Sequence, residues 1–515
     1  MRERIVGLDV GTTGTRAVVF DPEGNIYASA VGEYSLLVPQ PGYGEQEPQA
    51  ILEAVVRALR EAVARARLAP REVTAIGISA VLHSVITLDR EDRPLTRAWT
   101  WVDTRSARQA ARIKQSHDAV SLYARTGCPV HPMYLPAKIS HVRETMPEVF
   151  ARAARFVSIK EYLLTQLYGA HVVDYGIGSG SGCLNMQNKD WDAEALAIAG
   201  IRRDQLSELV EPTSLLRGMR RQFADAIGID PDTPLAVGSS DGTLSSLGSG
   251  AVAPGQMTAM IGTSGAVRAI SDRPQVDERG RTWCYYLAAD RWVAGAAINN
   301  AGIVYRWVRD DLLRVPAAER EGAYAALDRA AAAIPPGSNG LLFLPFLAGE
   351  RAPYWNADAR GVLFGLSLGH SQGHIVRAAL EGVAYRMYSI FTALREVVGR
   401  PHEVRATGGF TKSPLWVQIL ADVFGQRLHV PQVHEASAFG AAFLAMMGLG
   451  LVRGIDEMQR LVRVEREYAP DAGRHACYER LFDFYMRMYW HLQDQFSEIA
   501  SIQRGEEPAQ GERPA

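Results

Sequence analysis

The first 80 residues of the chain alternate between short apolar runs and polar turns. Residues 5–8 and 17–20 are apolar and flank a turn rich in glycine and threonine, which predicts a β-hairpin. A strand-like segment follows over 25–34. Residues 49–66 carry apolar side chains at helical spacing, and 73–79 have the pattern of a buried strand. This order of elements predicts a mixed sheet with helices rather than a barrel of repeating βα units.

The second half of the chain repeats this theme. Residues 257–261 and 266–270 read as strands around a second Gly/Ser/Thr turn at 262–265. Further on, the pattern predicts two helices and a short strand, at 300–313, 374–395 and 404–406. Two halves that each open with such a hairpin indicate an ancient duplication.

The repeat predicts two domains, because 515 residues are too many for one hydrophobic core. A stretch rich in Gly, Ala and Ser near 247–255 marks the expected boundary. We therefore divide the chain into an N-terminal domain at 1–247 and a C-terminal domain at 248–500. The remaining residues, 501–515, have a composition typical of a disordered tail.

Composition narrows the class of protein. The 55 Lys and Arg balance the 57 Asp and Glu, so nothing favours a nucleic-acid partner or an acidic membrane surface. We find no apolar run of membrane-spanning length and no signal-peptide pattern. The four cysteines are scattered without CxxC spacing, which favours reduced thiols in a cytoplasmic protein. The sequence leaves open whether the protein forms a homodimer.

The first turn has the chemistry of a phosphate site. Its glycines let backbone N–H groups converge on an anion, and Thr12, Thr13 and Thr15 add hydroxyl groups. Asp9 at the strand end offers a carboxylate to a hydrated divalent cation. An ordinary hairpin is the alternative interpretation. The sequence contains neither a P-loop nor a G-x-G-x-x-G motif.

Residues 238–242 allow two interpretations. They match G-x-S-x-G after a predicted strand at 235–237, which would make Ser240 a hydrolase nucleophile. That interpretation leaves both Gly/Thr turns unexplained, and the glycines that follow make a poor start to a long helix. Alternatively, Asp241 accepts the proton of a substrate hydroxyl that attacks a γ-phosphorus atom. Asp-Gly is also a common turn pair.

Taken together, the motifs resemble those of the FGGY family of carbohydrate kinases over about residues 4–495. The segments that carry the resemblance are the two turns at 9–16 and 262–265, the adenosine loop at 407–413 and the C-terminal signature at 361–381. The resemblance implies an α/β fold with two ribonuclease-H-like domains of the actin and hexokinase type. Each domain would be a mixed sheet with helices, and the two would surround a central cleft.

The resemblance also assigns roles to residues. Asp241 is the expected catalytic base, and Asp9 and Asp241 would hold Mg²⁺ through water. ATP and its phosphates would be bound by Thr12, Thr13, Arg16, Gly262, Thr263, Gly302, Gly409 and Ser413. In the family's N-terminal signature Met133 and Lys138 fit the pattern, whereas Leu135 and His141 depart from it.

The substrate side is expected in loops of the first domain. The residues implied are Thr12, Leu82, His83, Asp103, Arg105, Met133 and Asp241. His83 could bond to a sugar hydroxyl, and Arg105 could pair with a substrate carboxylate. Alternatively, Asp103 and Arg105 brace their own loop. Trp99 and Trp101 are either core residues or a wall facing the sugar.

Within the family, several segments resemble gluconate kinases: 82–84, 94–96, 101–106, 131–133, 158–162 and 190–192. The expected reaction is ATP-dependent phosphorylation of D-gluconate at its 6-hydroxyl. A xylulokinase, which also carries a histidine at the position of His83, or another pentulose or polyol kinase is the alternative. More remote alternatives are an actin-like nucleotide switch and a serine hydrolase that uses Ser240.

Overall fold

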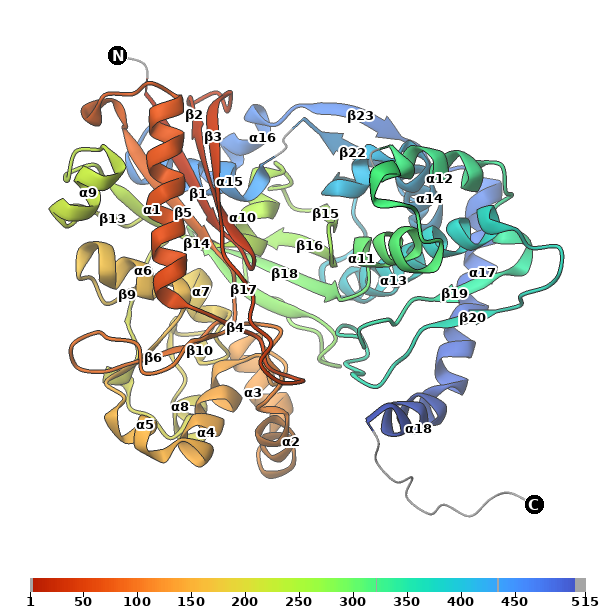
Figure 1. The fold of residues 1–515 in the computed structure, drawn as a ribbon, viewed down its shortest axis with the longest axis horizontal. Helices are drawn as coiled ribbons and strands as arrows, with labels where there is room; N and C mark the ends of the chain where they lie inside the picture. Colours follow the sequence, from red (N-terminus) through yellow and green to blue (C-terminus); the bar gives the residue numbers. More distant parts are fainter. Residues whose placement is uncertain (1–2, 321, 433–434, 505–515) are drawn as a thin grey trace. The chain divides into compact units, whose positions relative to one another are not determined.

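The chain folds into two compact units, each containing both helices and strands (Figure 1). A computed structural model describes residues 3–320, 322–432 and 435–504. Unit 1 consists of Met1–Pro254, Ala269–Ala294 and Val433–Arg463, and unit 2 of Gly255–Arg268, Gly295–Gln432 and Val464–Ala515. The predicted α/β class is confirmed, and each unit is described separately below.

Unit 1 is built on a six-stranded sheet with the order β13-β14-β5-β1-β2-β3. Its strands are β1 (Ile5–Val10), β2 (Gly14–Phe20), β3 (Ile26–Glu33), β5 (Ala75–Ala80), β13 (Leu215–Leu216) and β14 (Leu235–Ser240). β1 and β2 form the predicted antiparallel hairpin, and β1, β5 and β14 run parallel. Because parallel strands end at the same edge of a sheet, residues at the ends of β1 and β14 lie close together.

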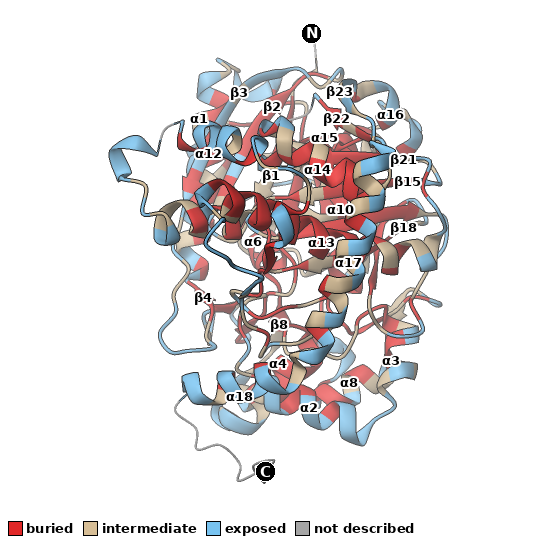
Figure 2. Ribbon diagram, turned by 90° about the vertical axis from the view of Figure 1, so that its right-hand side faces the viewer, coloured by how far each residue is buried: buried red, intermediate tan, exposed pale blue. Residues whose placement is uncertain are grey.

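Two helices cover the two faces of this sheet. α1 (Pro48–Arg65) buries its apolar stripe against one face, as its spacing predicts. α15 (Ala436–Gly448) lies on the other face, where glycines allow close contact. A Cβ on Gly77 would lie 1.9 Å from the carbonyl oxygen of Ala441. α10 (Asp241–Gly248) packs beside α15, and both helices are largely buried (Figure 2).

The rest of unit 1 consists of short elements. In chain order they are β4 (Glu45–Gln46), β6 (Ile86–Leu88), β7 (Ala98–Trp99), α2 (Ala107–Ser116), α3 (Ala119–Thr126), α4 (Leu135–Thr145), α5 (Pro147–Arg152), β8 (Arg155–Val157), α6 (Ile159–Tyr168), β9 (Val172–Asp174), α7 (Tyr175–Ser179), β10 (Leu184–Asn185), β11 (Asp190–Trp191), α8 (Ala193–Ala199), β12 (Glu208–Val210), α9 (Arg221–Ile227), β17 (Trp283–Ala288) and α16 (Met458–Leu461). α2, α4 and α8 pack against one another.

A second sheet has the order β17-β18-β16-β15-β21-β22-β23. Besides β17, whose bounds are given above, its strands are β15 (Gln256–Ile261), β16 (Gly265–Ser271), β18 (Arg291–Ile298), β21 (Glu403–Thr407), β22 (Leu428–Pro431) and β23 (Val464–Tyr468). β15 pairs in parallel with β21, and β21 with β22. The order β18-β16-β15-β21-β22 repeats β3-β2-β1-β5-β14 of the first sheet, as a duplication predicts.

Unit 2 also contains six α-helices and a two-stranded sheet among its described residues. The helices are α11 (Gly302–Trp307), α12 (Ala323–Ala332), α13 (Gln372–Val398), α14 (Pro414–Phe424), α17 (Ala472–His491) and α18 (Gln493–Arg504), and the strands are β19 (Leu342–Leu344) and β20 (Val362–Phe364). The helix expected at 300–313 begins at Gly302 and continues from Val308 to Leu312 as a π-helix. None of the helices in the described ranges combines the length and the hydropathy needed to cross a membrane.

The C-terminal end requires a correction. The expected disordered tail began at residue 501, but α18 continues to Arg504. Polar contacts hold its last turn: Arg504 pairs with Asp358 at 2.7 Å, and Arg360 donates to Gln503. The remainder of the expected tail, 505–515, lies outside the described residues.

Candidate active site

Two carboxylates lie at the edge of the first sheet where β1 and β14 end. Asp9 pairs in register with Ser79 on β5, whose hydroxyl donates to Asp9 Oδ1 at 2.7 Å. Asp241 is the first residue of α10, directly after β14. Burial raises the pKa of Asp9 from its usual 3.8 to about 7, and the charges of Asp241 and Glu435 add to the rise. The carboxylates therefore repel each other.

This donor set fits a hydrated Mg²⁺. Mg²⁺ is usually held by one or two carboxylates together with water and phosphate oxygens. Among the residues that the structure describes, no group of three or more His, Cys, Asp or Glu forms a complete metal site. Asp9 and Asp241 would thus bind water ligands of the cation, and the positive charge would relieve their repulsion.

Arg16 and residues at the start of α15 lie beside the two carboxylates. Arg16 on β2 forms an ion pair with Glu435, the residue that precedes α15. Ser437, in the first turn of the same helix, donates to the carbonyl oxygen of Asp241 at 3.3 Å. The start of α15, late in the chain, thus places Glu435 as the ion-pair partner of Arg16.

The first Gly/Thr turn, predicted to bind phosphate, is held by one hydrogen bond within the turn and by bonds from three side chains outside it. Gly11 N–H donates to Gly14 across the turn at 2.9 Å, and the Tyr34 hydroxyl donates to Gly11 O at 2.7 Å. The indole of Trp101 donates to the Thr12 hydroxyl at 3.0 Å, and the Gln46 side chain donates to the Thr12 carbonyl. Thr13 is exposed. These bonds fix the conformation of the turn.

His83 is the substrate-side residue with the most unusual backbone. Its φ of 64° lies in the left-handed region, which costs free energy for a residue other than glycine. The ring bonds through Nδ1 to the carbonyl oxygen of Gly180 at 2.8 Å and packs edge-on against Tyr134 and Tyr285. Leu82 and Met133 are buried, with 8% and 3% of their surfaces exposed. His83 therefore has the more accessible side chain of this group.

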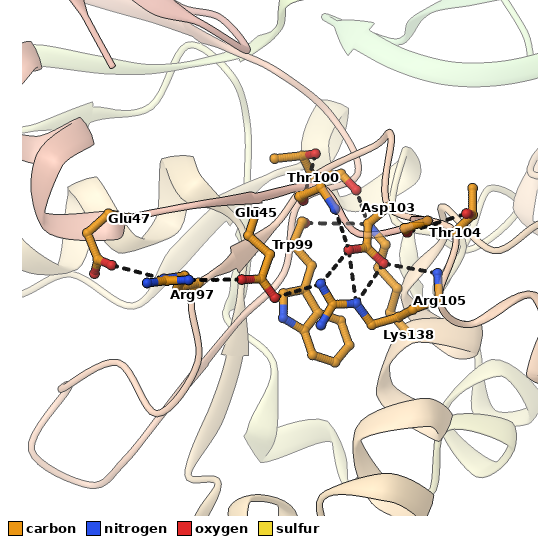
Figure 3. A network of polar contacts seen from close by, with 11 residues as sticks. Glu45, Glu47, Arg97, Trp99, Thr100, Asp103, Thr104, Arg105 and Lys138 are labelled. Atoms are coloured by element: carbon orange, nitrogen blue, oxygen red, sulfur yellow. Dashed lines mark hydrogen bonds and ion pairs between the residues drawn. The ribbon is translucent and has the colours of Figure 1, made fainter. Parts of the chain in front are cut away.

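Asp103 and Arg105 face each other inside a buried network (Figure 3). Arg105 Nε donates to both Asp103 oxygens at 2.9 Å, and its Nη2 donates to Glu45 at 2.6 Å. The guanidinium also lies over the rings of Tyr43 and Trp99. Only 7% of the Arg105 side chain is exposed. The geometry thus favours the loop-bracing interpretation over a contact with a substrate carboxylate.

In unit 2 the second turn is joined to the start of a helix. Gly302 N–H donates to the carbonyl oxygen of Gly262 at 2.8 Å, and Ile303 N–H to that of Thr263 at 3.1 Å. α11 begins at Gly302, and the Thr263 side chain is exposed. The turn and the first residues of α11 therefore form one rigid piece.

The predicted adenosine loop follows β21. Gly408 has a φ of 99°, and Gly409 begins a short 3₁₀ turn that ends at Lys412. Ser413 caps α14 by accepting a hydrogen bond from Trp416 N–H at 3.1 Å. Gly409 is exposed, whereas Ser413 is 8% exposed and its hydroxyl is committed to the cap. Of the two, Gly409 offers the more open surface.

Comparison with known proteins decides the family. The FGGY carbohydrate kinase N-terminal domain matches residues 4–248, and the C-terminal domain of that family matches residues 257–449. The chain belongs to the FGGY family of carbohydrate kinases. It is therefore a kinase, with ATP as the family's phosphoryl donor.

The relatives and solved structures match over the full length of the chain. Gluconokinase from Bacillus subtilis (strain 168) is 39% identical over 510 residues, covering 98% of this chain and 99% of that protein. Xylulose kinase from the same organism is 27% identical and covers 97% and 99%. The crystal structure of gluconate kinase from Lactobacillus acidophilus superposes with a TM-score of 0.91 at 32% identity, covering 97% of this chain and all of that one.

The structure argues against the serine hydrolase interpretation. The Ser240 side chain is fully buried and caps α10, where its hydroxyl oxygen accepts from Thr243 N–H at 3.3 Å. A nucleophile must instead present its oxygen to a substrate. The segment after Ser240 is helical, although for only eight residues. Asp241, one residue further, begins α10.

Sequence reasoning missed four residues that contact the predicted site residues and support them. Glu435, Ser437, Tyr34 and Gln46 contact the predicted site residues, but none lies in a motif that names its role. Glu435 is 419 residues from Arg16 in the chain. For Glu435 and Ser437, the sequence signal was the run of small residues in α15, which permits this helix to pack closely on the sheet.

We expect Gly302→Ala to weaken nucleotide binding by the kinase. The added Cβ would lie 2.3 Å from the Gly262 carbonyl oxygen, so the turn and α11 would have to separate. Calorimetric titration with ADP should show a Kd raised by about 10-fold or more. Gly454→Ala, which has open space around its Cβ, is the control. Equal ADP affinity in the Gly302 variant and the wild type would contradict this.

Proposed function

We propose that the protein phosphorylates D-gluconate at its 6-hydroxyl with ATP and Mg²⁺. The observation that carries the proposal is the 39% identity with gluconokinase over 98% of this chain, against 27% with xylulose kinase from the same organism. The paired carboxylates at the ends of β1 and β14 supply the chemistry that phosphoryl transfer to an alcohol needs.

In this proposal Asp241 is the general base. It takes the proton of the 6-hydroxyl as that oxygen attacks the γ-phosphorus, and the β–γ bridging oxygen leaves with ADP. Mg²⁺, held through water by Asp9 and Asp241, would shield the phosphate charge. Arg16 exchanges its partner Glu435 for a phosphate oxygen.

Two sets of residues position ATP. Thr12, Thr13 and the N–H groups of their turn surround the phosphoryl group that is transferred. The other phosphates and the adenosine are bound by Gly262, Thr263, Gly302, Gly409 and Ser413. Support comes from the rigid turns in which these residues lie and from the exposure of Thr13, Thr263 and Gly409.

On the substrate side we assign the direct contacts to His83, Thr12 and Asp241. Leu82 and Met133 form the packing behind His83. Asp103 and Arg105 keep the loop in place, because their charged atoms are already paired with each other and with Glu45. The substrate carboxylate is therefore recognised by donors other than Arg105.

A substrate screen tests the proposed function. ADP release should be measured with gluconate, xylulose, ribulose and glycerol at equal concentration. We expect kcat/KM for gluconate to exceed that for each of the others by about 10²-fold or more, because hydrogen-bonding sites reject analogues that leave polar groups unpaired. A preference for xylulose would support the pentulose kinase alternative. No stimulation by any acceptor would contradict the proposal.

We further propose that the enzyme works in the cytoplasm. All four cysteines are free, and Cys128, Cys183 and Cys284 are buried. Free thiols of this kind are typical of proteins in reducing compartments. Assembly as a homodimer stays a prediction.

A further inference from the structure

A fully buried lysine lies behind the substrate side of unit 1. Lys138 on α4 donates its Nζ hydrogens to three carbonyl oxygens: His83 at 2.5 Å, Thr100 at 2.7 Å and Trp99 at 3.4 Å. None of its surface is exposed. An ammonium group has three donors, so these bonds use its full capacity. Figure 3 shows Lys138 beside the Asp103–Arg105 pair.

The three carbonyls belong to two segments that are separate in sequence. One is the loop after β5, where His83 has its left-handed backbone. The other is the end of β7, which leads directly to Trp101, whose indole donates to the Thr12 hydroxyl. One ammonium group thus connects the backbone of His83 with the segment that contacts the first phosphate turn.

Balanced charges surround this lysine. Asp103 attracts its ammonium group and Arg105 opposes it, while burial lowers the pKa of Lys138 to about 7. The other titratable groups of these elements are Glu45 on β4, His83, and His141, Arg143 and Glu144 on α4; burial also lowers the pKa of His141. Burying an ammonium group costs free energy that an apolar side chain would not. The charge at this junction therefore needs an explanation beyond packing.

We propose that Lys138 is a positioning residue for the acceptor sugar: its ammonium group fixes His83 relative to Trp101 and thereby sets the affinity for the acceptor. The inference rests on the proposed role of His83 in substrate binding. Lys138 itself touches neither substrate nor reacting atoms. When the ammonium group is lost, three carbonyl oxygens lose their donor and the left-handed loop loses the bond that Lys138 makes to the His83 carbonyl.

The test compares Lys138→Met with Lys160→Met. Lys160 is the matched control, because it is also fully buried but pairs with Asp174 and donates to the Ser239 carbonyl, two residues before Asp241. Lys138→Met should raise KM for gluconate by about 10- to 100-fold, with KM for ATP and kcat changed less than about 3-fold. Lys160→Met should instead lower kcat. Equal rises in both KM values for Lys138→Met would overturn the inference.

The pH dependence gives a readout that general destabilisation would not. Gluconate affinity of the wild type should fall as the pH rises through about 7, because Lys138 loses its proton. The same titration with Lys138→Met should lack this fall. The variants share every other titratable group, so the difference between the two profiles isolates Lys138. Identical profiles would overturn the inference.

Two further measurements keep the outcome clear. If Lys138→Met does not fold, Lys138→Gln is measured instead. Its neutral amide has two N–H donors in place of three, so at least one carbonyl loses its partner and the variant should show a raised KM with a flat pH profile. A wild-type profile in that variant would overturn the inference. If the screen selects another acceptor, the comparison is made with that acceptor. A wrong substrate assignment is then distinguishable from a wrong role for Lys138.

Discussion

Asp241→Asn is expected to lower turnover by about 10²–10⁴-fold while the ADP affinity stays within about 3-fold of the wild type. The asparagine keeps the size of the side chain at the start of α10, but it cannot accept the proton of the attacking hydroxyl. Steady-state ADP release with gluconate measures the loss, and calorimetric titration with ADP measures binding. An actin-like switch would predict no comparable loss of its function.

Ser240→Ala is the matched control for this prediction. It removes the α10 cap one residue away, which should cost about 1 kcal/mol of stability. Turnover should stay within about 10-fold of the wild type, because Ser240 is buried and points into the helix start. Full turnover by Asp241→Asn, or a complete loss in Ser240→Ala, would contradict the assignment of the base.

Asp9→Asn is expected to abolish most turnover and yet to stabilise the metal-free protein. Burial and the charges of Asp241 and Glu435 raise the pKa of Asp9 from 3.8 to about 7. Between these pH values the folded state holds a proton that the unfolded chain releases. This group therefore makes folding less favourable as the pH rises from about 4 to about 7, and the penalty is constant above that window.

Removing the charge removes this penalty. At pH 8 and in the presence of a chelator, Asp9→Asn should unfold with a free energy higher than that of the wild type by up to about 4 kcal/mol. At pH 4 the two proteins should be nearly equally stable, since Asp9 is then protonated in the folded state. Urea unfolding at both pH values checks this. A variant that is less stable at pH 8 would show that Asp9 is not under electrostatic strain.

Local patterns predicted the parts of the site that depend on local structure. Alternating apolar runs and Gly/Thr turns correctly placed the hairpins β1–β2 and β15–β16 and the helices α1 and α13. Asp9 lies near the end of β1 and Asp241 directly after β14, as their sequence neighbours indicated, although the helix that begins at Asp241 was not predicted. Such features are encoded within a few residues, so a single sequence is enough to find them.

Contacts between distant segments could not be predicted in this way. The sequence left open whether Arg105 pairs with a substrate carboxylate or with Asp103, because it gives no sign that the guanidinium also contacts Glu45, Tyr43 and Trp99. Glu435 reaches Arg16 only because α15 packs on the first sheet. Lys138 fitted a family pattern, but its three carbonyl partners come from loops that only the fold brings together.

The most direct test of the account is to identify the product. Purified enzyme should be incubated with ATP, Mg²⁺ and D-gluconate, and the phosphorylated product analysed by ³¹P NMR and mass spectrometry. The account predicts 6-phosphogluconate in equal amount to ADP, and almost none with Asp241→Asn. ADP without a phosphorylated sugar acid, phosphorylation at a position other than the 6-hydroxyl, or an undiminished yield from Asp241→Asn would contradict it.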